Sequence, residues 1–391
     1  MPVETHSAGE ALAIRRKNAR AKWPGRNAAG AHFFPIAIPA FAPKSALSKD
    51  DKIFCIGSCF AREIEAVLAR LGYTILSKPE VDPPTGRIDQ NKYTLPSILN
   101  ELRHVFEPET YPREPFVITA PDGTAADYQL TGELRSRGPE LAQVMGRAAS
   151  SHFARIKQAD FIVLTLGYSE VWHDHNTGLD LNRAPTRALI DAEPERFALR
   201  VLSADDNAQH LRQILDLLAH HIPQGLRGIL TVSPVPLQST FRDCDVMLAN
   251  AYSKAALRCA VDAVLPDYDW LDYFPSYEMA TLSTPELVWS EDDFRHLNRD
   301  FVTLIMCHVL DGLIAPAAQS HTAEQSDAQA RLLARYTHGN RSKVSRLRTL
   351  EAKLMRQVLS DSKLRKYRRD RSAFFEDSKN KLARWYWRRT R

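Results

Sequence analysis

The sequence predicts an α/β fold, a three-layer α/β/α sandwich around a parallel central sheet, followed by a basic C-terminal helical extension. Three observations lead to this prediction. Short apolar runs alternate with stretches of helical periodicity between residues 51 and 313. The run 161–166 is apolar almost throughout, which is typical of a strand covered on both faces. The composition then changes abruptly after residue 319.

Composition sets the broad class of the protein. The chain has 391 residues, of which 44% are hydrophobic and 25% charged, as in a soluble globular protein. Five cysteines without a dense framework, and no secretory signal in the first 30 residues, favour a cytoplasmic protein. We expect a basic N-terminal arm (1–30), a main α/β domain (31–318) with an insertion at about 107–140, and a linker with a basic helical tail (319–391).

The elements follow in order from residue 51. A strand over 53–56 leads through a small-residue corner into a helix that Gly72 ends, and a second strand covers 73–76. The insertion is rich in Pro, Gly and charge, and we expect it to cover or line a site. The remaining periodic segments predict helices over 95–105, 142–156, 207–222, 249–265 and 301–313, and strands over 161–166, 229–232 and 268–273.

Ser58 stands at the corner between the first strand and its helix. A helix N-terminus carries unpaired backbone N–H groups and partial positive charge, so a serine placed there lies where an oxyanion is stabilised. The alternative is that Ser58 only caps the helix, as a serine in this position usually does.

Asp293 and His296 supply a candidate base for that serine. A carboxylate three residues before a histidine can orient the imidazole, which then takes the proton of a serine hydroxyl. The chain order Ser58, Asp293, His296 therefore predicts nucleophilic catalysis.

Gly57 to Ala61 spells Gly-Ser-Cys-Phe-Ala, and with this segment the chain resembles the GSCFA family, whose domain is similar to the SGNH/GDSL hydrolases and acyltransferases. The resemblance covers roughly residues 30–315 and implies a flavodoxin-like order of the strands in the sheet. The other segments that carry it are 164–172, 233–236, 273–278 and 293–296.

The resemblance implies a role for each matching position. Ser58 matches the nucleophile, His296 the general base and Asp293 the carboxylate that orients it. Gly86 resembles the glycine that contributes an oxyanion donor beside the Ser58 N–H. Gly167 begins the block that ends in Asn-Asp in the wider superfamily, and this chain has Ser169 and Glu170 there, so the usual asparagine donor is replaced by a shorter hydroxyl.

Two classes of function stay open at this stage. The first is a serine esterase or O-acyltransferase that acts on acyl esters, with a carbohydrate ester as the substrate that the resemblance implies and, for a transferase, a separate acyl donor. The second is a non-catalytic module that binds a glycan or scaffolds an assembly. We expect no cofactor and no metal, because neither Cys55 with Cys59 nor His173 with His175 has a matching further ligand in the sequence.

The tail is electrically opposite to the rest of the chain. Residues 331–391 hold 20 Lys and Arg against 5 Asp and Glu, whereas residues 1–330 hold 32 against 42. Such a tail suits an anionic surface at the inner face of a membrane or another polyanion. The alternative is a charged helical hairpin packed against the acidic body. Nucleic acid is disfavoured, because residues 1–330 offer no interleaved basic and aromatic surface.

Overall fold

The computed structural model describes residues 3–25, 32–78, 90–131, 136–222, 225–314 and 323–334. The chain divides into two compact units, Met1–Ala330 and Arg331–Arg391. The second unit is described only as far as residue 334, so all but the first four residues of the predicted basic tail lie outside the described residues. A helical segment spans 323–334 and begins inside the stretch predicted as a linker.

A five-stranded parallel sheet forms the centre of the first unit, in the order β11-β10-β6-β1-β2. Counted along the chain, this is the 2-1-3-4-5 order of flavodoxin-like folds. The fold-class prediction is confirmed. The strands are β1 (Lys52–Gly57), β2 (Thr74–Ile75), β6 (Phe161–Leu166), β10 (Arg227–Val232) and β11 (Leu271–Tyr273).

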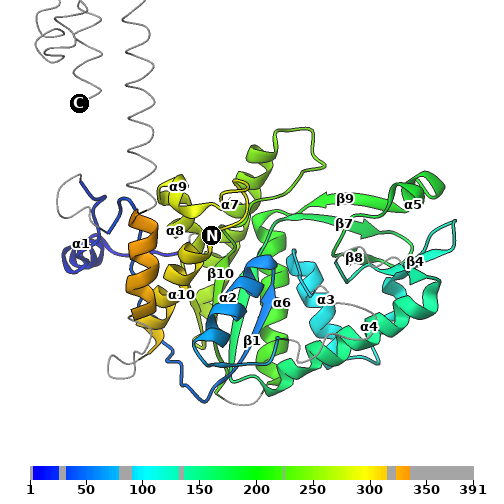
Figure 1. Ribbon diagram of the computed structural model, residues 1–391, viewed down its shortest axis with the longest axis horizontal. Coiled ribbons are helices and arrows are strands. Elements are labelled where there is room, and N and C mark those ends of the chain that lie inside the picture. The colour runs from blue at the N-terminus through cyan, green and yellow to red at the C-terminus, as the bar shows by residue number, and fades with distance from the viewer. Residues whose placement is uncertain are drawn as a thin grey trace, which may run out of the picture. The chain divides into compact units, whose positions relative to one another are not determined.

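Helices cover both faces of this sheet (Figure 1). On one face, alternate residues such as Phe54, Leu164 and Leu230 pack against α3 (Leu95–Phe106), α6 (Ala204–His221) and α7 (Val246–Val264). On the other lie α2 (Cys59–Arg70) and α10 (Arg299–Leu313). Both faces are apolar because both are buried, which explains the continuous apolar run of β6.

Two small antiparallel sheets extend from this sandwich. The predicted insertion folds as β3 (Val117–Thr119), β4 (Thr124–Asp127) and β5 (Ser136–Arg137). The second sheet, β8-β7-β9, follows the β6 exit loop and was not predicted. Its strands are β7 (Glu170–Asp174), β8 (Leu179–Leu181) and β9 (Phe197–Val201), so Glu170 begins a strand, and His173 lies within one.

The other helices are short or peripheral. Helix α1 (Ala8–Lys17) lies in the predicted N-terminal arm, has no buried residue and begins with a capping box between Ser7 and Glu10. The remaining helices are α4 (Pro139–Phe153), α5 (Arg187–Ala192), α8 (Ser276–Leu282) and α9 (Pro285–Val288).

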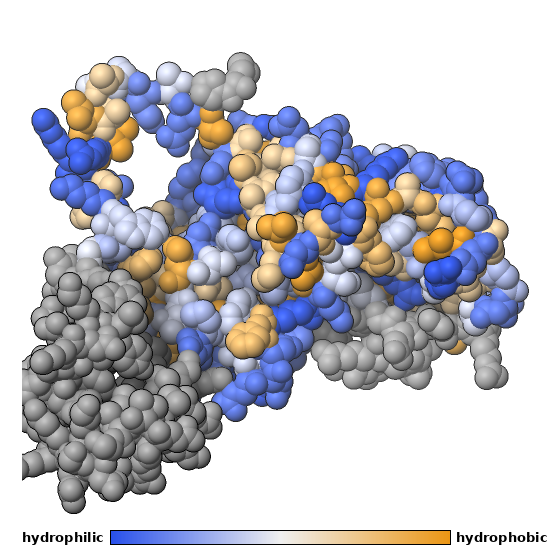
Figure 2. Space-filling model, turned by 90° about the horizontal axis from the view of Figure 1, so that it is seen from above, coloured by the Kyte–Doolittle hydropathy of each residue, from blue (hydrophilic) through white to orange (hydrophobic). Residues whose placement is uncertain are grey.

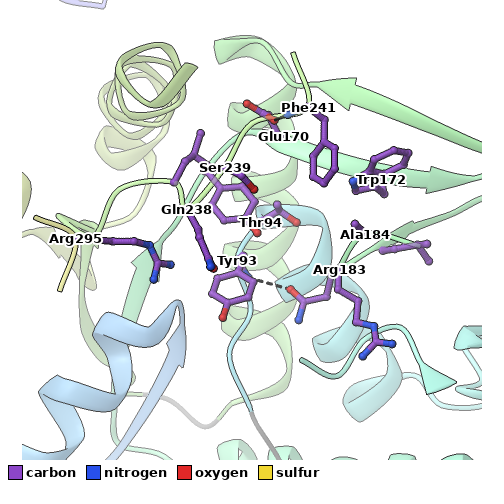
Figure 3. Close-up of a pocket in the computed structure, with 14 residues that line it drawn as sticks. Tyr93, Thr94, Glu170, Trp172, Arg183, Ala184, Gln238, Ser239, Phe241 and Arg295 are labelled. Atoms are coloured by element: carbon purple, nitrogen blue, oxygen red, sulfur yellow. Dashed lines mark hydrogen bonds between the residues drawn. The ribbon is translucent and has the colours of Figure 1, made fainter. Parts of the chain in front are cut away.

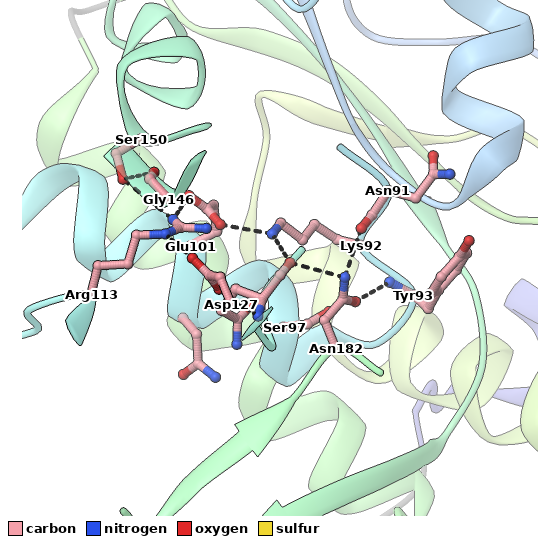
Figure 4. Close-up of polar contacts among 12 residues, drawn as sticks. Asn91, Lys92, Tyr93, Ser97, Glu101, Arg113, Asp127, Gly146, Ser150 and Asn182 are labelled. Carbon is pink, nitrogen blue, oxygen red and sulfur yellow. Dashed lines mark hydrogen bonds and ion pairs between the residues drawn. The ribbon is translucent and has the colours of Figure 1, made fainter. Parts of the chain in front are cut away.

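A buried ion cluster ties the insertion to the sandwich (Figure 4). The Glu101 carboxylate lies 2.7 Å from Lys92 Nζ and 2.6 Å from Arg113 Nη1, and Arg113 Nε lies 2.6 Å from Asp127. The backbone N–H of Lys92 also donates to the Gly57 carbonyl at 2.7 Å. The cluster therefore fixes the segment that follows residue 90 beside the end of β1.

The surface seen in Figure 2 is mainly hydrophilic, with separate hydrophobic patches. Large apolar side chains that are well exposed include Phe294 (84%) and Met247 (73%). Within the described ranges, no helix combines the length and the apolar character that crossing a bilayer requires.

Candidate active site

Ser58 lies where the strand order of the sheet reverses, at the carboxyl end of β1 and beside β6, the position at which open α/β sheets bind ligands. The preceding Gly57 has φ of +137°, and a Cβ there would stand 2.1 Å from the Thr165 carbonyl oxygen. Only glycine lets the two strands approach this closely. The Ser58 side chain is consequently buried, with the residue 3% exposed, and packs against Thr165.

The hydroxyl of Ser58 does not cap α2. Ser58 occupies the N-cap position, but its side chain makes no capping hydrogen bond. Its Oγ shares a hydrogen bond of 3.2 Å with Thr165 Oγ1, and its backbone N–H donates to Thr165 Oγ1 at 3.0 Å. The capping alternative therefore does not describe how the hydroxyl is used. In this conformation the Ser58 N–H, predicted as an oxyanion donor, is engaged by Thr165.

Asp293 and His296 are brought together as the sequence indicated. The imidazole Nδ1–H donates to Asp293 Oδ2 at 2.6 Å, and the His296 backbone N–H donates to Oδ1 at 2.7 Å. These bonds from His296, with a further one from the Arg295 N–H, hold the pKa of Asp293 well below its usual range. The carboxylate thus stays ionised and fixes the ring, with Nε2 directed away from it.

Ser58 and the Asp293–His296 pair make no hydrogen bond to each other within the described part of the chain. Arg295 lines a pocket that Ser58, Asp293 and His296 do not line. Ser58 Oγ is paired with Thr165, and His296 Nε2 accepts a hydrogen bond from Arg295 Nη1 at 3.2 Å.

The structure gives a different result for each residue predicted to bind the oxyanion or the substrate. Gly86 lies outside the described residues. Gly167 is a packing position, since a Cβ there would stand 2.3 Å from the Tyr93 carbonyl oxygen. Ser169 is fully buried and turned toward α6 and α7, where its Oγ accepts from Asn207 Nδ2 at 3.1 Å. The Ser169 hydroxyl is thereby committed to the contact between β6 and these helices.

Glu170 differs from Ser169 because it lines a pocket. Both of its carboxylate oxygens accept hydrogen bonds from the loop after β10, one from Thr240 Oγ1 at 2.6 Å and one from the Phe241 N–H at 3.2 Å. Glu170, which stands where the wider superfamily has Asp, thus anchors a loop of the pocket wall.

The pocket has a volume of about 260 Å³ (Figure 3). Figure 3 shows Arg295 at one end and Trp172 at the other, with Tyr93 between them. The rings of Tyr93 and Tyr168 stack at 5.6 Å, and those of Trp172 and Phe241 meet edge to face at 5.1 Å. No residue in the described part of the insertion lines this pocket. The insertion lines a second pocket, with a volume of about 220 Å³.

Several residues of the site were not singled out from the sequence. Lys254 of α7 is 1% exposed, and its Nζ donates to the carbonyls of Gly167 at 2.7 Å and Val235 at 2.9 Å, which tie together the exit loops of β6 and β10. Burial lowers its pKa to about 7. A sequence signal for it exists, since Lys254 shares a helix face with Leu257 and Val261.

Comparison with known proteins identifies a family over the same region. The model of the GSCFA family matches residues 52–308, a range that contains Ser58, Asp293 and His296. A solved structure of a DUF4886 family protein from Bacteroides uniformis shares 13% identity over 72% of this chain and 93% of that chain, with a TM-score of 0.33, a likeness too distant to support an argument. A comparison with curated proteins found no match.

Proposed function

The chain belongs to the GSCFA family, and we propose that it is a serine-dependent esterase or O-acyltransferase of SGNH/GDSL-like chemistry, acting on an acyl ester of a carbohydrate. The observation that carries the proposal is the 2.6 Å hydrogen bond between Asp293 and His296, which leaves Nε2 as the proton acceptor. Ser58, at the N-terminus of α2 and the reversal point of the sheet, is the nucleophile.

The proposed reaction has two steps. Ser58 Oγ attacks the ester carbonyl carbon while its proton passes to His296 Nε2, and the tetrahedral oxyanion develops at the positive end of α2. The C–O bond to the leaving alcohol then breaks, and the alcohol takes the proton from His296. In the second step, water or a sugar hydroxyl attacks the acyl-Ser58 with the same histidine as base, which makes the enzyme a hydrolase or a transferase.

The pocket supports a carbohydrate as the alcohol part of the ester. Its aromatic rings offer apolar faces, and the side chains of Thr94, Asn182, Gln238 and Ser239 line it as well. A polyhydroxylated ring needs both kinds of contact, because its C–H faces are apolar and its rim donates and accepts hydrogen bonds.

Catalysis requires two weak contacts to be exchanged. Ser58 Oγ with Thr165, and His296 Nε2 with Arg295, are each 3.2 Å long, at the outer limit of good hydrogen-bond geometry. Such bonds often tighten or re-form only when substrate is bound.

The test is acetate release from 4-nitrophenyl acetate and from glucose pentaacetate, with Ser58→Ala, Asp293→Asn and, as a control, Ser151→Ala, an exposed serine of α4 that does not line the pocket. We expect activity in the wild type and the control, loss in Ser58→Ala, and a loss of about 10⁴-fold in kcat for Asp293→Asn, as in other serine triads. Addition of glucose as acceptor separates transfer from hydrolysis. Equal activity of the wild type and Ser58→Ala would reject the proposal.

A second candidate is a non-catalytic glycan-binding or scaffolding module. In the structure Ser58 Oγ is paired with Thr165, and His296 Nε2 is paired with Arg295. These contacts occupy both groups of the proposed proton transfer and favour the second candidate. This candidate expects glycan binding that is the same in the wild type and Ser58→Ala, with no turnover in either.

The predicted tail is a separate proposal, based on its charge alone. We propose that residues 331–391 bind an anionic membrane surface or another polyanion peripherally. Vesicles containing phosphatidylserine should bind the full chain and release it as salt is raised, whereas neutral vesicles should not bind. Equal binding to both kinds of vesicle would reject an electrostatic role of the tail.

A further inference from the structure

Arg295 is the cation of the pocket that lies nearest the Asp293–His296 pair. It is half-buried, lines the pocket and immediately precedes His296. Its Nε donates to the Pro236 carbonyl at 3.3 Å and its Nη1 to His296 Nε2 at 3.2 Å. Both acceptors are neutral, and within the described ranges no carboxylate lies within 4.0 Å of this guanidinium.

Among the described residues that line the pocket, Glu170 is the one carboxylate. Both oxygens of Glu170 are held by Thr240 and Phe241, so they are already engaged. The indole N–H of Trp172 is buried and has no hydrogen-bond partner in the described part of the chain. A guanidinium in this setting gains most from an anionic acceptor, which accepts two parallel hydrogen bonds.

The contact between Arg295 and His296 has a direct chemical consequence. Because Nη1 is a donor, Nε2 must be the acceptor in this bond, and it carries no proton. Nε2 is also the atom that must accept the Ser58 proton in the proposed reaction. The resting contact therefore occupies the lone pair on which catalysis depends.

From these contacts we propose that the pocket binds an anionic group of the substrate, a carboxylate or a phosphate, through Arg295, and that this binding withdraws the guanidinium from His296 Nε2 and frees the base. The first half concerns binding alone, whereas the second half rests on the proposed function. Arg295 is accordingly a binding residue for the anion and a positioning residue for His296. A neutral ligand in the pocket does not compete for the guanidinium and leaves the base covered.

The binding half is tested by calorimetric titration with inorganic phosphate, glucuronate and glucose at constant ionic strength. The variants are Arg295→Gln and the matched control Arg242→Gln, whose guanidinium stacks on Tyr252 and does not line the pocket. We expect Arg295→Gln to weaken anion binding about tenfold or more, the size of one charge-assisted hydrogen bond, and Arg242→Gln and glucose binding to change little. Tighter binding of phosphate or of glucuronate identifies the preferred anion. Equal anion binding by the wild type and Arg295→Gln would overturn the proposal.

The coupling half is tested by the rate at which a fluorophosphonate labels Ser58. We expect phosphate to accelerate labelling of the wild type and of Arg242→Gln, and Arg295→Gln to be labelled faster than the wild type without phosphate and not to respond to it. Slower labelling of Arg295→Gln together with no acceleration of the wild type would overturn the coupling. If no variant is labelled while anion binding depends on Arg295, the proposed function fails and the anion site stands.

Discussion

Removal of the negative charge at Glu101 is the sharpest test of what holds the fold around the site. The Glu101 carboxylate is fully buried between Lys92 Nζ and Arg113 Nη1, at 2.7 Å and 2.6 Å. Glu101→Gln keeps the shape of the side chain and leaves two buried cations facing one remaining carboxylate, that of Asp127.

The size of the effect follows from this imbalance. Breaking a buried ion pair by removing one partner costs about 3–5 kcal/mol, because the other charge is left buried and uncompensated. For a protein of this size such a loss lowers Tm by about 5 °C or more. The surface pair Arg187–Asp191, with side chains 87% and 56% exposed, gives the control: we expect Asp191→Asn to leave Tm unchanged.

The assay is thermal unfolding followed by circular dichroism between pH 7 and pH 2.5. Burial disfavours the charge of Glu101, but Arg113 and Lys92 outweigh it and lower its pKa from 4.5 to about 2. A carboxyl whose pKa is lower in the folded state stabilises the fold above its unfolded pKa, and this contribution is lost as the pH falls. The Tm difference between the wild type and Glu101→Gln should therefore shrink from pH 4.5 downward. A Tm of Glu101→Gln equal to that of the wild type at pH 7 would refute the reasoning.

Three further substitutions test the geometry of the strand ends. Gly57→Ala should lower stability strongly, because the new Cβ would stand 2.1 Å from the Thr165 carbonyl oxygen. The control is Gly123→Ala, where φ is also positive but the new Cβ meets no atom within 4 Å. Equal losses of Tm in the two variants would show that strain at positive φ, and not the close approach, decides the effect. Burial lowers the pKa of Lys254 in the folded state to about 7, so the wild type should gain stability as the pH rises from about 7 toward 10.5. Lys254→Met should abolish this gain. Parallel pH profiles of Tm for the two proteins would contradict the burial of this amine. Ser169→Ala should lower Tm, because the Asn207 side chain loses a hydrogen-bond acceptor. The labelling of Ser58 by a fluorophosphonate should stay unchanged. Lost labelling at an unchanged Tm would instead indicate that Ser169 is an oxyanion donor.

The periodicity of the sequence was sufficient for the sandwich. Each of the five parallel strands overlaps a predicted strand. The inner strands β1, β6 and β10 are continuous apolar runs because both of their faces are buried, whereas the edge strands β2 and β11 are short and mix apolar with polar residues. The sheet β8-β7-β9 left no such signal, since its strands are short and mix apolar residues with His173, Asp174 and Asp180. Its pairing depends on contacts between residues far apart in the chain.

The candidate site was predictable where its geometry is local. The spacing of Asp293 and His296 is enough to place the imidazole on the carboxylate, and their hydrogen bond is found in the structure. The direction of Ser169 was not predictable, because it depends on the packing of α6 and α7 against the end of β6. The role of Arg295 likewise depends on the loop from Pro236 that lies against it.

The most direct test of the central claim is intact-mass detection of a fluorophosphonate adduct on the purified full chain, beside Ser58→Ala, His296→Ala and the control Ser151→Ala, which lies on the exposed face of α4. The account expects one adduct on the wild type and on Ser151→Ala, none on Ser58→Ala and strongly slowed labelling of His296→Ala. Absence of any adduct, with and without phosphate, at a concentration that labels a control esterase would contradict an activated serine at position 58.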